Sequence, residues 1–314
     1  MSIIKRLKLK YVAAGILCVS LCVAYGFTGA ARHQKLNEPE VFHIYASCYP
    51  AYALAGLLIK DVPGMHLHML TQPQDSGYTA YTLSDWETAL INNADALIFF
   101  GYGFEAFAQA YSASDKAAIN ALSGLELKHI DDYETIDFTG EEATQAAIPW
   151  LYMTTSGGLT ICESLCIYMS VLDEVYTQTY YDNLDAAYAM FDQALGMAEE
   201  FRTDKKVRVA AAHEAFVYPA EELGFEVSLL IRRRAGQTLS EEEISECIKA
   251  LKDADINTIL IEKQADADNI KNFEQAGFSV VKLDLMLDCD TSFASDGYFD
   301  MLKANMKKLY ECRE

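Results

Sequence analysis

The sequence predicts an α/β fold with two lobes, each with a mainly parallel sheet flanked by helices, and a long connecting helix between them. Short apolar runs alternate with helical segments through the second half of the chain, and the first half repeats this alternation. Strands that alternate with helices form parallel sheets. Between the halves, 180–201 is an uninterrupted stretch with apolar residues spaced by three and four, which is typical of an amphipathic helix.

The first half supplies the elements of one lobe. Ser84 followed three residues later by Glu87 is a capping box, which predicts a helix through 92. The segment 72–81 is rich in Gly, Ser, Gln and Thr and predicts a loop. The other expected elements are strands at 41–47, 65–70, 94–100 and 127–130, and helices at 51–58 and 104–111.

Two helices are expected between the halves. The first is capped by Thr160, or begins earlier near Thr155, and ends at about 176. The second, at about 1.5 Å per residue, is about 33 Å long, the diameter of a small domain, so it can join two lobes as a rigid spine. The second half adds strands at 206–212, 225–231, 257–262 and 279–284, a short helix closed by Gly224, and helices at 240–255 and 265–276.

Length and charge narrow the class of protein. With 314 residues, of which 51% are hydrophobic, the chain is long enough for two domains with a sizeable core. The net charge of -21 argues against nucleic acid, which requires a basic face, and against docking on anionic lipid. A large net charge also favours solubility. We expect a monomer.

The amino terminus predicts export. Basic residues between Lys5 and Lys10 precede the uncharged apolar run 11–27, a pattern typical of a secretory signal or an uncleaved anchor. Cys18 or Cys22 could instead carry a lipid after cleavage, although a bulky residue precedes each. We therefore expect a signal or anchor at 1–31, a tether at 32–40, lobes at 41–176 and 204–314, a connecting helix at 177–203, and a location at the cell surface or in the periplasm.

Ligand-type side chains fall at the carboxyl ends of predicted strands. His213 follows one strand, Glu262 ends another, and Asp284 ends the last. In open parallel sheets, ligands bind beyond these ends, so the three side chains are candidates for one cleft. The alternative for His213 is a core histidine, and the alternative for Asp284 is a helix or turn cap. No nucleophile elbow, P-loop, dinucleotide fingerprint or zinc-protease helix is present, so we expect a binding protein rather than an enzyme.

Other features leave two interpretations open. His66 and His68 alternate on one strand and share a face, so they could chelate a metal or form a solvated strand face, whereas His43 is expected to pack against the sheet. The run 232–234 of three arginines is either solvated surface or an anion contact. The segment 154–158 could offer helix N–H groups to an anion. Cys162 and Cys166, four apart on a helix, are either packing residues or a metal pair.

Several motifs occur in order over about 41–311. The first is Ala-Ser-Cys-Tyr-Pro at 46–50, and the next two are the segments 75–85 and 93–105. Trp-Leu at 150–151, His-Glu-Ala-Phe-Val-Tyr at 213–218 and Leu-Asp-Leu at 283–285 follow. In this order and at these distances, they resemble motifs of the zinc and manganese substrate-binding lipoproteins of bacterial ABC transporters, among them Ala-Ser-Phe-Tyr-Pro, the metal loop and Ala-Asp-Leu-Val-Val-Tyr-Asn-Gly-Ala-Gly-Leu-Glu.

The resemblance implies a receptor that carries a divalent metal, of the zinc or manganese class, to an ABC permease in the membrane. Of the family's four metal ligands, the second-lobe pair falls on His213 and Asp284, whereas the two first-lobe histidines fall on Gly77 and Ile148. Because a closed zinc site needs about four donor atoms, the loss of two histidines leaves a degenerate, incomplete set of metal ligands. Possible additional cleft residues are Cys48, Asp75, Tyr78 and Glu262. The alternatives are an anionic small molecule or metal chelate as ligand, or a surface partner protein that binds no ligand.

Overall fold

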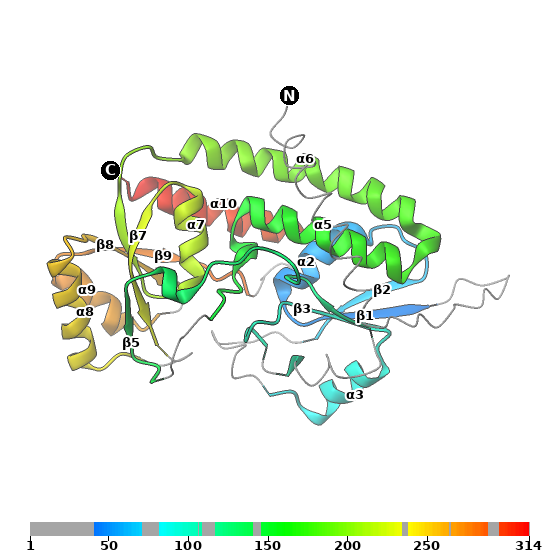
Figure 1. The fold of residues 1–314 in the computed structure, drawn as a ribbon, viewed down its shortest axis with the longest axis horizontal. Helices are drawn as coiled ribbons and strands as arrows, with labels where there is room; N and C mark the ends of the chain where they lie inside the picture. The colour runs from blue at the N-terminus through cyan, green and yellow to red at the C-terminus, as the bar shows by residue number, and fades with distance from the viewer. Residues whose placement is uncertain are drawn as a thin grey trace.

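The protein consists of two α/β lobes placed side by side under a long helix (Figure 1). The computed structural model describes residues 41–70, 82–105, 107–108, 117–140, 146–233, 238–263, 265–287 and 295–313. The expected signal and tether, together with Asp75, Gly77 and Tyr78, lie outside these residues. Within them, two all-parallel sheets flanked by helices confirm the predicted fold class.

The first sheet has the strand order β2-β1-β3-β4. Its inward face, which includes Ile44 and Ala46, packs in the largest core cluster with α2, whereas the opposite face, which includes Leu97 and Phe99, packs with Ile91 of α3. The strands are β1 (Phe42–Ala46), β2 (Met65–Met69), β3 (Ala96–Phe99) and β4 (Ala117–Asn120), and the helices are α2 (Tyr49–Leu58) and α3 (Asp85–Asn93). The predicted capping box of α3 is present, with Ser84 and Glu87 bonded reciprocally.

The expected strand at 127–130 is wrong. His129 makes only an isolated antiparallel bridge with Ala147, and the chain then enters a short 3₁₀ turn, Ile130–Asp132. The fourth strand is β4, which lacks the β-branched and aromatic residues that usually indicate a strand, apart from Ile119. Pairing with the buried strand β3 decides its conformation instead.

The second sheet has the order β5-β7-β6-β8-β9. Helices α8 and α9 cover one face, through residues such as Cys247 and Phe273, and the other face joins the largest core cluster. The strands are β5 (Thr135–Asp137), β6 (Arg208–Ala211), β7 (Glu226–Arg232), β8 (Thr258–Glu262) and β9 (Ser279–Leu283), and the helices are α7 (Val217–Glu222), α8 (Glu241–Asp253) and α9 (Ala267–Gln275). The edge strand β5 was not expected, and it comes from the part of the chain assigned to the first lobe.

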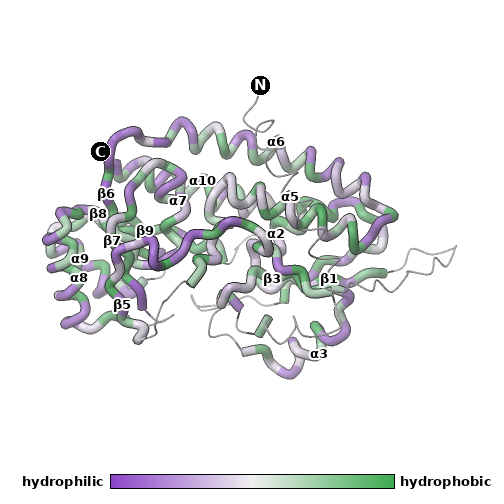
Figure 2. The backbone as a smooth tube through the Cα atoms, in the orientation of Figure 1, coloured by the Kyte–Doolittle hydropathy of each residue, from purple (hydrophilic) through white to green (hydrophobic). Residues whose placement is uncertain are grey.

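Three long helices tie the lobes together. The helices are α5 (Thr155–Leu172), α6 (Thr177–Phe201) and α10 (Ser295–Glu311). The long helix α6 packs on α2, α5 and α10 and runs along both lobes (Figure 1). Hydrophilic and hydrophobic residues alternate along it, as the predicted amphipathic helix requires (Figure 2). α5 is apolar and long enough to cross a membrane, but half of it is buried inside the protein, which is typical of a core helix.

Candidate functional site

The three strand-end side chains predicted for the cleft lie on one edge of the second sheet. β8 pairs in parallel with β6 on one side and with β9 on the other. Just beyond the strands, Ala212 donates its N–H to Leu260 at 2.8 Å, and Lys263 donates to Leu283 at 2.7 Å. His213, Glu262 and Asp284 therefore follow one another along this edge, on strands spaced by about 4.8 Å.

His213 is held as a neutral ring. Its ring makes a T-shaped contact with Trp150, with ring centroids 4.8 Å apart, and its Nδ1 accepts the N–H of Ala215 at 3.1 Å. Burial lowers the pKa of His213, and Arg233 lowers it further, although Glu214 opposes this. A neutral imidazole is a good ligand for zinc-class metals. Because Nδ1 accepts a hydrogen bond, the proton of the neutral ring lies on Nε2.

Asp284 is held firmly at the end of β9. Its backbone N–H donates to Asn305 Oδ1 at 2.8 Å, and Asn305 Nδ2 donates back to the Asp284 carbonyl at 2.7 Å. Oδ1 accepts the N–H of Met286 at 2.9 Å, and Oδ2 lies 3.2 Å from Lys263 Nζ. A metal that binds Oδ2 must therefore compete with an ammonium group.

Glu262 is also paired with a cation. Its side chain is buried and forms an ion pair with Arg233 through Oε1, while Oε2 is buried with no hydrogen-bond partner in the described structure. An unsatisfied buried carboxylate oxygen is costly. Arg232 pairs with Asp137 of β5, so both described arginines of the 232–234 run contact carboxylates of the protein, and both are largely buried. The solvated interpretation of these two arginines is therefore wrong.

On the first-lobe side, Cys48 is fully buried before α2. Burial, together with the charge of Glu105, raises its pKa far above the ordinary thiol value, which favours packing over a thiolate ligand. Ile148, which the expected resemblance aligns with a histidine, is also fully buried, and its carbonyl accepts the hydroxyl of Tyr218 at 2.8 Å. Asp75 and Tyr78, the other expected cleft residues, lie outside the described residues.

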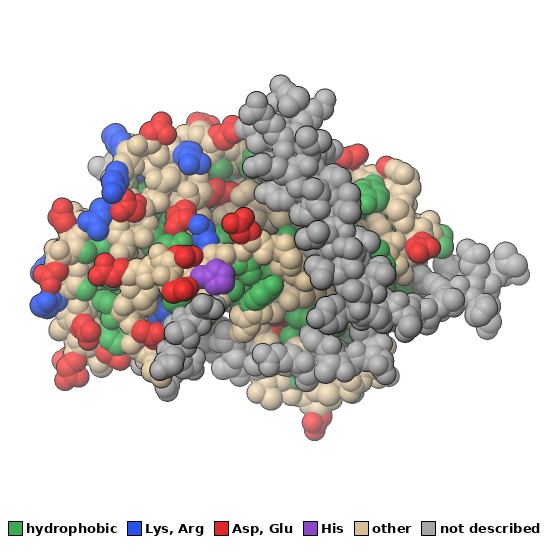
Figure 3. All heavy atoms as spheres, viewed as in Figure 1, with side chains coloured by type: hydrophobic (Ala, Val, Ile, Leu, Met, Phe, Trp, Pro, Cys, Tyr) green, Lys and Arg blue, Asp and Glu red, His purple; other side chains and the backbone are tan. Residues whose placement is uncertain are grey.

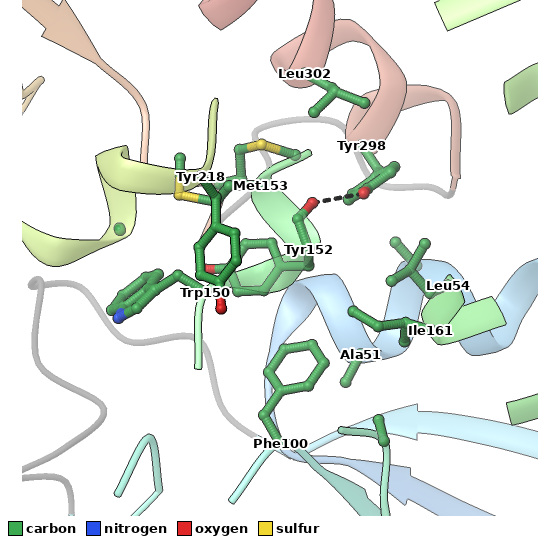
Figure 4. Packing of buried hydrophobic residues seen from close by; sticks show 14 of the residues in the cluster. Ala51, Leu54, Phe100, Trp150, Tyr152, Met153, Ile161, Tyr218, Tyr298 and Leu302 are labelled. Carbon is green, nitrogen blue, oxygen red and sulfur yellow. Dashed lines mark hydrogen bonds between the residues drawn. The ribbon is translucent and has the colours of Figure 1, made fainter. Parts of the chain in front are cut away.

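An aromatic cluster joins the lobes beside these residues (Figure 4). Trp150 contacts Phe104 of the first lobe at 4.9 Å and His213 of the second at 4.8 Å between ring centroids. Tyr152 stacks on Phe100 at 5.2 Å and donates its hydroxyl to the carbonyl of Leu285 at 2.9 Å. The strand ends of both lobes therefore meet at this cluster.

The buried carboxylate of Glu105 organises the first-lobe edge, and sequence reasoning gave it no role. Oε1 accepts the Ser47 hydroxyl at 2.5 Å and the N–H of Phe100 at 3.0 Å, and Oε2 accepts the N–H of Gly101 at 2.9 Å. Burial raises its pKa. Its place at the end of the segment 93–105, which resembles a family motif, was the available signal.

The helix N-terminus at 154–158 is already bound to a carboxylate. Thr155 and Ser156 donate their N–H groups to Glu222 at 3.0 and 3.1 Å, and the Thr154 hydroxyl caps Gly157. The expectation that this segment offers N–H groups to an external anion is therefore wrong. Cys162 and Cys166 are free, buried thiols in the largest core cluster, as the packing interpretation requires.

Among the described residues, no group of three or more His, Cys, Asp or Glu side chains is arranged to hold a metal ion. The acidic side chains do not gather at one place on the face shown in Figure 3, where they are spread over the C-terminal lobe among lysines and arginines.

Two parallel α/β lobes under a spanning helix, with ligand-type residues at strand ends where the lobes meet, define a two-lobed solute-binding protein. The family model described as zinc-uptake complex component A, periplasmic (ZnuA), matches residues 44–312, and the chain belongs to this family. This membership confirms the expected resemblance and supports a receptor of an ABC importer that acts outside the cytoplasm. No curated protein matches the sequence significantly.

Three solved structures illustrate the likeness of fold. FpvC of Pseudomonas aeruginosa in complex with Mn²⁺ has a TM-score of 0.75 at 18% identity, over 87% of this chain and 98% of that one. AdcAII of Streptococcus pneumoniae has a TM-score of 0.68 at 19% identity, over 87% and 99%. The laminin-binding protein Lbp of Streptococcus pyogenes has a TM-score of 0.67 at 18% identity, over 86% and 99%.

Proposed function

We propose that the protein is an exported receptor that delivers a divalent transition metal of the zinc or manganese class to an ABC permease. The observation that carries this proposal is the retention of His213 and Asp284 at the carboxyl edge of the second sheet, in a chain of the zinc-uptake family. The metal is cargo rather than a resident cofactor. We also propose that the protein acts as a monomer and that the segment 1–31 exports it and can keep it at the membrane.

We also propose that the affinity for the metal is modest. A metal at this edge must displace Lys263 from Asp284 and the proton from Nε2 of His213. With isoleucine at 148, which is fully buried, the first lobe lacks one imidazole donor there. Oxygen ligands from 75–78, from Glu262 or from water must complete the shell. Fewer nitrogen ligands and an open position favour fast release.

The test is a zinc titration against a competing chelator, on protein purified without a metal-affinity tag. His213→Ala should abolish binding at the cleft. The double substitution Gly77→His with Ile148→His should raise zinc affinity by orders of magnitude, because it restores two imidazoles. If the wild type already binds as tightly as the double variant, the ligand assignment is mistaken. Elemental analysis of the purified protein identifies the metal.

A second candidate is an anionic ligand or a metal chelate, and the cations at this edge favour it. Arg233 and Lys263 lie beside Glu262 and Asp284, and the Nε2–H of His213 is a donor rather than an acceptor. These groups suit a carboxylate. Titration with zinc alone and with preformed zinc citrate separates the two candidates. Tighter binding of the complex, weakened by Arg233→Met, would favour the chelate.

A further inference from the structure

Two carboxylates on the carboxyl edge of the second sheet are paired with cations that differ in exposure. Glu262 pairs with Arg233, and their side chains are 3% and 12% exposed. Asp284 pairs with Lys263 at 3.2 Å, and here the carboxylate is 13% exposed whereas the lysine side chain is 58% exposed. The first pair is enclosed by the protein, and the second has one partner in solvent. Of the two cations, Lys263 is therefore the one that can leave its carboxylate.

The backbone brings the Lys263 ammonium next to Asp284. Lys263 follows the last residue of β8, and its N–H donates to the carbonyl of Leu283 in β9 at 2.7 Å. From that fixed point, a flexible four-carbon side chain reaches the carboxylate. Burial lowers the pKa of Lys308 and the charge of Asp284 opposes this, so Lys308 also lies nearby. Its Nζ, however, donates to the Lys282 carbonyl at 2.6 Å, so Lys263 supplies the direct ion pair.

A metal ion and the Lys263 ammonium need the same oxygen of Asp284. Oδ1 accepts the N–H of Met286 at 2.9 Å, whereas Oδ2 lies beside the ammonium. A monovalent cation at this oxygen replaces one positive charge by one, and a divalent ion replaces it by two. Only the exchange for a divalent ion therefore gains electrostatic energy at this carboxylate.

We propose that Lys263 is a tethered counter-ion that takes the place of the metal on Asp284, and that it regulates how tightly the receptor holds its cargo. This inference rests on the proposed function and adds a control on the same site. The nearly buried carboxylate stays paired when no metal is bound, and the lysine side chain moves into solvent when a divalent ion binds. Because the ion pair re-forms as the metal leaves, it stabilises the metal-free protein and so lowers the affinity.

The test is a Zn²⁺ titration against a competing chelator, on three variants of protein purified without a metal-affinity tag. Lys263→Met keeps the apolar stem and removes the charge, so it should raise zinc affinity about fivefold, or about 1 kcal/mol, the upper value for an exposed ion pair. Lys263→Arg keeps the pair and should bind zinc no more tightly than wild type. Lys282→Met removes an exposed lysine two residues from Asp284, and it should change the affinity by less than about twofold.

Ionic strength separates an effect of charge from a change of shape. Salt screens an ion pair that has an exposed partner, so the competing ammonium weakens as the salt concentration rises. The ratio of zinc affinities between Lys263→Met and wild type should therefore shrink toward one between about 0.01 M and about 1 M sodium chloride, as the Debye length falls from about 30 Å to about 3 Å. Any effect of chloride on zinc itself is common to both proteins and cancels in this ratio.

The outcomes separate this inference from the proposed function. If wild-type zinc binding depends on His213, but Lys263→Met changes it as little as Lys282→Met does, or by a ratio independent of salt, the counter-ion is rejected and the receptor stands. Weaker binding of preformed zinc citrate by Lys263→Met, with no gain for zinc, would also reject it, because Lys263 would then contact the ligand. If neither wild type nor Lys263→Met binds zinc through His213, the proposed function fails and this inference fails with it.

Discussion

Glu105 should be the most costly single carboxylate to remove from the first lobe. It is 1% exposed, and its two oxygens accept three donors: the buried Ser47 hydroxyl, the buried N–H of Phe100 and the half-buried N–H of Gly101. Glu105→Ala leaves all three unsatisfied. At about 1–3 kcal/mol for each unsatisfied buried group, and with partial relaxation, the loss should be about 3–5 kcal/mol. With an unfolding entropy of about 2.1 cal/mol/K per residue, that loss lowers the melting temperature of a chain of this size by roughly 5–8 °C.

The assay is thermal unfolding followed by circular dichroism, with two control variants. Glu105→Gln keeps one acceptor oxygen but places an amide among donors, so it should cost less than the alanine variant. Glu126→Ala, at an exposed position in the same lobe, should stay within about 0.5 kcal/mol of wild type. An alanine variant of Glu105 that melts within about 2 °C of wild type would refute the reasoning.

The pH dependence tests the same carboxyl group. Burial raises the pKa of Glu105 above its usual range, so the folded protein binds this proton more tightly than the unfolded chain does. The resulting stabilisation is present below the unfolded pKa and is lost as pH rises through the folded pKa. Glutamine does not titrate. The stability advantage of wild type over Glu105→Gln should therefore shrink as pH rises from about 4, near the unfolded pKa of glutamate, and a constant difference would contradict this cause.

Three further predictions follow from packing and burial. Gly158→Ala should destabilise the protein by about 1–3 kcal/mol in urea unfolding, because a Cβ there would lie 2.2 Å from the Tyr298 hydroxyl. An unchanged urea midpoint would show that the Tyr298 side chain moves aside without cost. Gly196→Ala, with no neighbour within 4 Å, should stabilise α6 by up to about 1 kcal/mol in the same assay. Native protein should be alkylated faster at Cys312, which is partly exposed with a pKa raised to about 11, than at the fully buried Cys48; equal rates by mass spectrometry would contradict the burial.

The sequence predicted most of the fold because the second half alternates cleanly between short apolar runs and amphipathic helices. The capping box at Ser84 and the periodicity of α6 located two helices within a few residues. β4 was missed because Ile119 is its only strand-forming residue, and β5 because it is only three residues long. Pairing with β3 and with β7 fixes these two strands.

The positions of the candidate site residues in the sheet were predictable from the sequence, whereas their ion-pair partners were not. Strand ends put His213, Glu262 and Asp284 on one edge because parallel pairing leaves no other arrangement. The cations that oppose two of these carboxylates come from a strand end and a loop, and ion pairs between them depend on tertiary geometry. For the same reason, the hydrogen bonds that Glu105 accepts could not be inferred from its position after the strand.

The C-terminal helix α10 also has a consequence for how the protein folds after export. It is the last of the described helices, yet it packs against α2 and α6 as well as β9. The hydrophobic packing around α2 in the first lobe is therefore complete only after α10 has been synthesised. In the same way, β5 can pair only after β7 has been synthesised. Contacts between residues that are far apart in the sequence slow folding, and these contacts make the folding of one lobe depend on the other. A nascent chain stalled before 295 should remain a target for proteases.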